Sequence, residues 1–299
     1  MKKMLFIMNP CAGLRRANRY LPEIIATFNA AGYEVTTYMT AHTGHGTEIA
    51  QSRAKDFDAV VCAGGDGTLN ETVTGVLRSG ADVPIGYIPC GSTNDFAATM
   101  KLPGNVVQAA QAIVEGRPVA QDVGRFGDRY FSYVASFGAF TKTSYATPQN
   151  VKNALGHLAY ILEGIQELRQ IHSIHMRFEF DGQVVEDDFL FGAISNSTCV
   201  GGVLNLDPSQ VDMRDGKFEL LLIRMPKDVN ELRECIQALR SQKYDCAAIT
   251  FRSVSNLTIY PEAGVDWTLD GEKAEGDYRI EVENLHQAVR LLLKEEPEC

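Results

Sequence analysis

A glycine-rich loop directly after an apolar run constrains this chain more than any other feature. Residues 59–63 read Ala-Val-Val-Cys-Ala, and residues 64–68 read Gly-Gly-Asp-Gly-Thr. Glycine weakens a regular strand and is favoured where the backbone turns sharply or approaches a ligand closely. Residues 69–77 then carry a helical pattern, so the loop lies near a helix N-terminus, where an anion is favoured. We therefore predict a nucleotide-phosphate site, with the carboxylate of Asp66 placed to hold a cation or a water.

The first part of the chain alternates short apolar runs with amphipathic helical patterns. This alternation predicts a three-layer α/β domain, in which a mainly parallel sheet carries helices on both faces. Ligands of such sheets bind outside the carboxyl ends of the strands. The expected strands are residues 4–8, 33–39, 59–62 and 85–88, and the expected helices are residues 21–28, 48–55, 69–77, 96–100 and 106–115.

The pattern changes near residue 117, after which β-type stretches dominate. Glycine-containing turns such as Asp181-Gly182 separate several of them and are typical of hairpins. This part predicts a mainly antiparallel β-sandwich domain. We expect domains of residues 1–125 and 126–299, and leave open a return of the last strand to the first domain. The expected strands are residues 119–125, 130–137, 174–180, 184–193, 218–223, 249–251, 257–260, 278–282 and 289–293, with helices over residues 154–170 and 231–239.

Charge and cysteine usage argue against several classes of protein. The chain has 299 residues and a formal net charge of −10, which disfavours a nucleic-acid partner because such proteins carry basic patches. Its seven cysteines are odd in number and scattered, which indicates a reducing, cytoplasmic setting. No run approaches the roughly 20 apolar residues of a membrane span, so any lipid contact is expected to be peripheral.

Two further glycine-containing loops follow expected strands, and both resemble the first in position. They are residues 9–13 (Asn-Pro-Cys-Ala-Gly) and residues 89–95 (Pro-Cys-Gly-Ser-Thr-Asn-Asp). Because the carboxyl ends of parallel strands meet at one edge, we expect these loops to converge with residues 64–70. Taken singly, the first could be a turn and the third a helix cap. The chain has neither a Walker A sequence nor a Gly-x-Gly-x-x-Gly fingerprint after its first strand.

These loops resemble those of a known family. Residues 64–68 resemble the loop shared by soluble diacylglycerol kinases, sphingosine and ceramide kinases, NAD kinases and, more distantly, phosphofructokinases. Residues 9–13 and 91–96 resemble the Asn-Pro-x-[Ala/Ser]-Gly and Gly-Thr-x-Asn-Asp-Phe motifs of the lipid-kinase branch. Residues 215–218 (Asp-Gly-Lys-Phe) and 269–272 (Leu-Asp-Gly-Glu) resemble two of its later motifs. The matches run in order along the whole chain, which therefore resembles a bacterial soluble lipid kinase of the diacylglycerol kinase type.

The resemblance implies that ATP binds to the three loops. Ser92 stands where the family usually has threonine, and it keeps the hydroxyl group. The residues implied for the ATP site are Asn9, Pro10, Cys11, Ala12, Gly13, Thr40, Gly64, Gly65, Asp66, Gly67, Thr68, Leu69, Asn70, Glu71, Gly91, Ser92, Asn94 and Asp95.

The resemblance also implies a catalytic pair and two positions for Mg²⁺. Asp66 would assist the catalytic metal ion, and Glu272 would accept the proton of the lipid hydroxyl. Asp215, with backbone groups of Asp212 and Lys217, would hold a structural Mg²⁺ in the β domain. Without the resemblance to this family, Glu272 would be interpreted as a solvated carboxylate in a turn, and Asp215 as part of a hairpin turn.

The preferred hypothesis is an ATP- and Mg²⁺-dependent kinase that phosphorylates a lipid alcohol at the inner face of the membrane, most simply diacylglycerol to phosphatidic acid. An NAD kinase shares the loop over residues 64–68, but the motifs over residues 9–13, 91–96 and 269–272 favour the lipid branch. A long-chain base, a polyprenol or a glycolipid remains an alternative acceptor. A non-catalytic nucleotide or lipid sensor is also an alternative, and the oligomeric state stays open.

Overall fold

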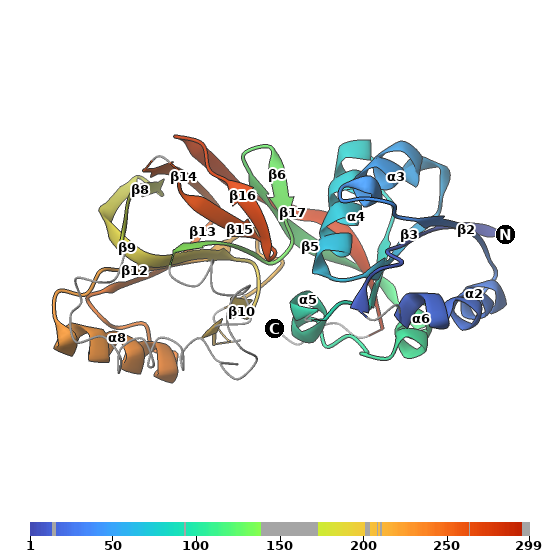
Figure 1. The fold of residues 1–299 in the computed structure, drawn as a ribbon, viewed down its shortest axis with the longest axis horizontal. Coiled ribbons are helices and arrows are strands. Elements are labelled where there is room, and N and C mark those ends of the chain that lie inside the picture. Colours follow the sequence, from blue (N-terminus) through green and yellow to red (C-terminus); the bar gives the residue numbers. More distant parts are fainter. Residues whose placement is uncertain are drawn as a thin grey trace. The chain divides into compact units, whose positions relative to one another are not determined.

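The structure is a computed structural model that describes residues 1–13, 16–92, 94–138, 173–200, 204–207, 209, 211–262 and 264–294. The chain divides into two compact units (Figure 1). The first contains Met1–Val123 and the chain from His286, and the second contains Gly124–Leu285. The helix predicted over residues 154–170 lies outside the described residues.

The first unit is built on a parallel sheet with the strand order β2-β1-β3-β4. The register pairs Met8 with Ala63 and Gly64 with Pro89, so the carboxyl ends of three strands lie level with one another. The sheet confirms the predicted parallel arrangement. Its strands are β1 (Lys2–Met8), β2 (Tyr33–Met39), β3 (Ala59–Gly64) and β4 (Ile85–Pro89), with β17 (Ile280–Leu293) parallel to β4.

Helices cover both faces of this sheet (Figure 1). Helices α2 (Leu21–Ala30) and α6 (Val106–Glu115) lie on one face, and α3 (His45–Arg53) and α4 (Asp66–Ser79) lie on the other. Alternate side chains of a strand point to opposite faces, so a strand between two helical layers is apolar throughout. The last five residues of β1, Met-Leu-Phe-Ile-Met, are accordingly all fully buried. Three short helical segments complete the unit: α1 (Arg16–Arg19), η2 (Ala54–Asp56) and α5 (Asp95–Thr99).

The second unit is mainly antiparallel and confirms the other half of the predicted fold class. Its strands follow the order β16-β15-β7-β9-β8-β14-β17, and β12 pairs with both β9 and β13. One core of aromatic and aliphatic side chains, with Trp267 and Phe137 in contact, fills it. Strand β5 (Arg117–Phe126) begins in the first unit and ends in the second. The other strands of the second unit are β6 (Arg129–Phe131), β7 (Val134–Gly138), β8 (Ile174–Phe180), β9 (Gln183–Ser195), β10 (Cys199–Val200), β11 (Leu204–Asn205), β12 (Phe218–Arg224), β13 (Ile249–Val254), β14 (Asn256–Pro261), β15 (Asp266–Leu269) and β16 (Glu272–Glu275).

Some element boundaries differ from the sequence predictions. Strand β17 is continuous where two strands, residues 278–282 and 289–293, were predicted. Polar residues interrupt its apolar alternation, and its middle is held by a distant contact: the backbone N–H of Gln287 donates to Asp122 Oδ1 at 2.7 Å. The hairpin of β15 and β16 was not predicted as strands, because β16 reads Glu-Lys-Ala-Glu. Within the described residues, no helix combines the length and the apolar character needed to cross a bilayer.

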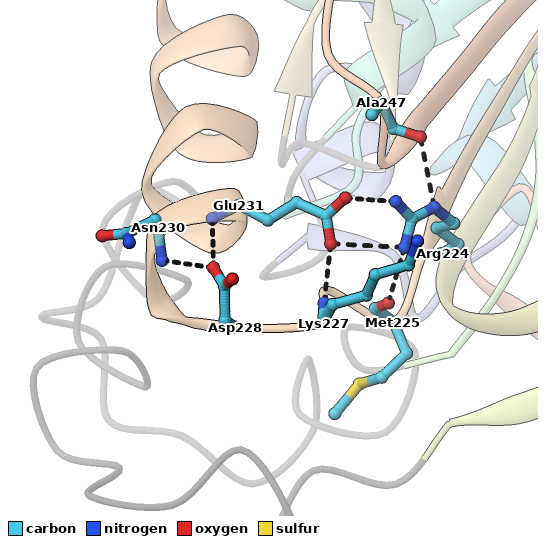
Figure 2. A network of polar contacts seen from close by, with 7 residues as sticks. All are labelled: Arg224, Met225, Lys227, Asp228, Asn230, Glu231 and Ala247. Atoms are coloured by element: carbon cyan, nitrogen blue, oxygen red, sulfur yellow. Dashed lines mark hydrogen bonds and ion pairs between the residues drawn. The ribbon is translucent and has the colours of Figure 1, made fainter.

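Helix α8 (Val229–Ser241) of the second unit begins at a well-formed cap (Figure 2). The carboxylate of Asp228 accepts the backbone N–H groups of Asn230 and Glu231 at 2.8 and 2.9 Å. The side chain of Glu231 turns back and accepts the backbone N–H of Lys227 at 2.6 Å. Such caps satisfy N–H groups that have no partner inside the helix.

Glu231 also joins this helix to the sheet (Figure 2). Both of its carboxylate oxygens bind the guanidinium of Arg224, which is the last residue of β12. The two side chains are only 16% and 12% exposed. Arg224 donates further hydrogen bonds to the carbonyls of Ala247 and Met225, at 3.1 and 3.2 Å. A pair this sheltered is costly to break, because the remaining partner stays buried without its counter-charge.

We expect Glu231→Gln to lower the free energy of unfolding by about 1–3 kcal/mol at neutral pH, measured by chemical denaturation. The N–H of Lys227 and the guanidinium of Arg224 lower the pKa of Glu231 below its usual 4.5. The stabilisation is therefore complete above that value and is lost as the pH falls through the lowered pKa. Glu234→Gln, on the exposed side of the same helix, is the control, and equal losses in both variants would contradict the assignment.

Candidate active site

The three glycine-containing loops of the first unit are in backbone contact. The N–H groups of Cys90 and Gly91 both donate to the carbonyl of Gly64, at 2.7 and 3.2 Å. A Cβ atom added to Gly91 would lie 2.6 Å from the Cα of Gly65, and one added to Gly13 would lie 1.6 Å from the carbonyl oxygen of Cys90. No side chain fits at either contact. The convergence predicted for residues 9–13, 64–70 and 89–95 is therefore present in the structure.

Asn9 and Thr40 lie at the same edge of the sheet. The side-chain oxygen of Asn9 accepts the N–H of Cys11 at 2.9 Å, and its Nδ2 lies 3.5 Å from the hydroxyl of Thr68. The backbone N–H of Thr40 donates to the carbonyl of Met8 at 2.9 Å. These contacts place the first loop beside the N-terminus of α4, which has fourteen residues and begins at the second loop.

Asp66 connects the second loop to the third. Its two carboxylate oxygens accept the backbone N–H groups of Asp95 and Phe96, at 3.0 and 3.3 Å. Burial raises the pKa of Asp66, although these N–H groups oppose the shift. Burial and the charge of Asp66 also raise the pKa of Asp95. A cation bound between these two partly buried carboxylates would offset their repulsion. Each oxygen of Asp66 that accepts one hydrogen bond keeps a lone pair that can bind such a cation.

Other predicted site residues hold the loops in shape. Asn94 adopts a left-handed backbone conformation, and its amide closes the third loop through hydrogen bonds of 2.8 and 2.9 Å with the N–H and carbonyl of Gly91. The carboxylate of Glu71 accepts the N–H groups of Gly44 and Gly46 at 2.7 and 2.9 Å, at the start of α3. Leu69 is 1% exposed and belongs to the core.

The remaining residues of the predicted ATP site differ in exposure. Gly64 and Thr68 are buried, Cys11 and Ser92 are exposed, and the others are partly buried: Pro10, Ala12, Gly13, Gly65, Gly67 and Asn70. The loops thus offer mainly backbone groups, and Ser92 is the more exposed of the two hydroxyl-bearing loop residues that the structure describes, the other being Thr68.

Glu272 is exposed in the second unit and follows the turn between β15 and β16. Asp270, at that turn, is 4% exposed. Its carboxylate accepts three backbone N–H groups, from Ser132 at 2.6 Å, Tyr133 at 3.0 Å and Val134 at 3.1 Å. These bonds fix the turn that presents Glu272. From the sequence, Asp270 is distinguished only as part of the Leu-Asp-Gly-Glu motif, since its hydrogen-bond partners are more than 130 positions away along the chain.

The predicted structural metal site lies on turns before β12. The N–H of Arg214 donates to Asp212 Oδ1 at 3.0 Å, and the N–H of Lys217 donates to Asp215 Oδ1 at 2.9 Å. Glu219 was not predicted for this site, although it is 2% exposed and electrostatically coupled to both aspartates. A charged residue inside the apolar run Phe-Glu-Leu-Leu-Leu was the available signal. Carboxylate and backbone carbonyl oxygens, the groups predicted for this site, are ligands that Mg²⁺ prefers.

Sequence comparisons identify relatives along the whole chain. Residues 3–126 match the diacylglycerol kinase catalytic domain, and residues 135–293 match the YegS C-terminal NAD kinase beta sandwich-like domain. A diacylglycerol kinase of Bacillus subtilis (strain 168) is 30% identical over 300 residues, which cover 99% of this chain and 98% of the relative. The chain belongs to the diacylglycerol kinase family. It is therefore a lipid kinase.

Other members of the diacylglycerol kinase family agree with this assignment. A diacylglycerol kinase of Staphylococcus carnosus (strain TM300) is 34% identical over 273 residues, covering 91% of this chain and 89% of that relative. A crystal structure described as a diacylglycerol kinase of Bacillus anthracis str. Sterne has a TM-score of 0.73 at 21% identity, covering 98% of this chain and 97% of the other. At that identity the structural likeness supports the fold alone.

We expect Gly91→Ala to lower the free energy of unfolding by about 1–3 kcal/mol, because the added methyl group overlaps the backbone of Gly65. The control is Gly104→Ala, where a Cβ meets nothing within 4 Å and the backbone is not left-handed. It should be neutral, or stabilising by about 0.4–1 kcal/mol. Denaturant unfolding curves decide the comparison, and equal stability of the two variants would contradict the contact between the loops.

Proposed function

We propose that this lipid kinase transfers the γ-phosphate of ATP to a lipid hydroxyl in a Mg²⁺-dependent reaction, most simply from diacylglycerol to phosphatidic acid. The observation that carries the proposal is the backbone contact of three glycine-containing loops beside the N-terminus of α4. The relatives named diacylglycerol kinase support the acceptor. Residues 1–125 would form the nucleotide domain, and residues 126–299 would form the lipid domain.

The loops suit a triphosphate because they present backbone N–H groups where side chains are excluded. Gly65, Gly67 and Gly91 would approach the phosphates closely, and the helix dipole of α4 would favour their negative charge. Asp66 and Asp95 would hold the cation. When bound, Mg²⁺ offsets the charge of the phosphate oxygens. Asp66 would therefore have two tasks, since it also fixes the start of α5.

Glu272 would act as the general base of the transfer. As the lipid oxygen bonds to the γ-phosphorus, the bond from that phosphorus to the β–γ bridging oxygen breaks and leaves ADP. The hydroxyl proton would pass to the carboxylate of Glu272, which is exposed and can accept it. Asp270 would position this base through the turn it stabilises.

We further propose a cytoplasmic protein that meets its substrate peripherally at the membrane surface. The lipid alcohol would be taken from the bilayer, since the donor ATP is water-soluble and the acceptor is not.

A lipid panel tests the donor and the acceptor together. With labelled ATP and Mg²⁺, we expect the wild type to phosphorylate diacylglycerol in mixed micelles and to leave NAD unmodified. Asp66→Asn should reduce turnover by at least about 10²-fold, because it removes the charge proposed to hold the cation. Circular dichroism controls for its folding. Labelling of NAD alone, or undiminished turnover in Asp66→Asn, would contradict the proposal.

The role of Glu272 has its own matched test. Glu272→Gln should lower kcat by about 10²–10⁴-fold with little change in KM for ATP, since only proton transfer is lost. Glu275→Gln lies on the exposed end of the same strand and should keep wild-type kcat. Wild-type turnover in Glu272→Gln would remove this residue from the mechanism.

A further inference from the structure

Two free cysteines of the second unit are in contact, although they come from different elements. Cys235 belongs to α8 and Cys246 precedes β13, and a side-chain hydrogen bond joins their thiol groups. Cys235 is 3% exposed, whereas Cys246 is partly exposed. This pair differs from a lone surface cysteine, because a sulfur that becomes oxidised at the surface already has a second sulfur beside it.

Polar contacts hold the two elements together at this point (Figure 2). Glu231 lies four residues before Cys235, so the two side chains share one face of α8. The guanidinium of Arg224 binds the carboxylate of Glu231 and donates to the carbonyl of Ala247. Cys246 immediately precedes Ala247. One side chain of β12 therefore holds the cysteine-bearing face of α8 beside the cysteine-bearing segment before β13.

The chain between the two cysteines is also fixed. Helix α8 is followed by Gln242, whose positive φ of 55° turns the chain back. The ring of Tyr244 packs on the ring of Phe251 in β13, with 4.3 Å between their centroids. The carbonyl of Cys246 accepts the N–H of Ile249 at 3.0 Å. The two thiols therefore meet in the folded protein, without local unfolding.

We propose that Cys235 and Cys246 form an oxidation site, at which a peroxide joins the two sulfurs in a disulfide. The cross-link would fasten α8 to the segment before β13. In the cytoplasmic setting proposed above, such a bond forms transiently and is reversed by other thiols. The site uses none of the residues assigned to the kinase reaction, so it is a property of the second unit beyond the proposed function.

The two cysteines would have different tasks. Cys246 is the sulfur that a peroxide can reach. After its thiol proton is lost, this sulfur bonds to one oxygen of hydrogen peroxide, the O–O bond breaks, and the other oxygen leaves with that proton as water. Burial raises the pKa of Cys235 to about 12, so Cys235 is still a thiol at neutral pH.

The second step closes the disulfide. The sulfur of Cys235 bonds to the sulfenic sulfur of Cys246, the S–O bond breaks, and the oxygen leaves as water with the proton of Cys235. In total, two thiols are oxidised to one disulfide, and one hydrogen peroxide is reduced to two waters.

Peptide mapping of the full-length wild type treated with hydrogen peroxide tests the site. Remaining thiols are blocked with iodoacetamide, and the protein is digested with trypsin without reductant. Trypsin separates the two cysteines into peptides of residues 234–240 and 244–252. We expect mass spectra to show these peptides linked, at least about tenfold more abundantly than in untreated protein, and separated again by dithiothreitol.

Single variants test the tasks of the two sulfurs. In Cys235→Ala, peroxide should leave Cys246 as a sulfenic acid that dimedone labels, because no second sulfur consumes it. In Cys246→Ser, Cys235 should stay reduced, because its buried thiol has no oxidised partner. Cys11→Ser removes an exposed thiol of the first unit and is the control, which should keep the linked peptides.

The wild-type measurement needs no substitution, so the test does not depend on the folding of the variants. Absence of the linked peptides after peroxide treatment would overturn the inference. Oxidation of Cys246 to sulfinic acid with Cys235 left reduced would overturn it too. Neither result measures phosphorylation, so the proposed kinase reaction stands or fails separately.

Discussion

The close approach of the Gly65 and Gly91 backbones is the constraint on which the first unit depends. A Cβ atom at Gly91 would lie 2.6 Å from the Cα of Gly65, so the two loops can meet only without a side chain there. The parallel register of β3 and β4 brings the loops to the same level, and Asp66 then joins them through the N–H groups at the start of α5. A ligand at these loops therefore meets mostly backbone groups, and backbone N–H groups are suitable donors for a phosphate.

Two buried carboxylates of the second unit illustrate how differently such groups can be stabilised. Asp270 accepts three backbone N–H groups and needs no counter-ion to hold its turn. Glu219 lies among like charges, and one of its oxygens has no partner in the described part of the chain. The burial of Asp270 is therefore explained by the hydrogen bonds of the fold alone. The second carboxylate is stabilised differently: burial and the neighbouring aspartates raise its pKa to about 8, so it is mostly protonated and uncharged at neutral pH.

The sequence predicted the parts of the structure that depend on local pattern. The apolar run before residue 64 and the glycines after it were sufficient to place β3 and a helix after it, although α4 begins at Asp66, three residues before the predicted helix over residues 69–77. Contacts between distant residues were not predictable in this way. Asp66 binds N–H groups 29 and 30 positions away, and Asp270 binds groups more than 130 positions away. Strand β16 was missed because its residues are mostly charged, and its pairing with β15 comes from the turn at Asp270 and Gly271, both with positive φ.

Calorimetric titration of the nucleotide onto the protein, without lipid, tests most directly whether the three loops bind a triphosphate. The ligand would be Mg²⁺ with a non-hydrolysable ATP analogue, and the variants would be Gly13→Ala and Gly104→Ala. Gly13 has a left-handed backbone, and a Cβ there would overlap the carbonyl of Cys90, whereas Gly104 has open space. The account predicts binding by the wild type and Gly104→Ala and its loss, at least about tenfold, in a folded Gly13→Ala. Equal affinity of all three proteins would contradict it.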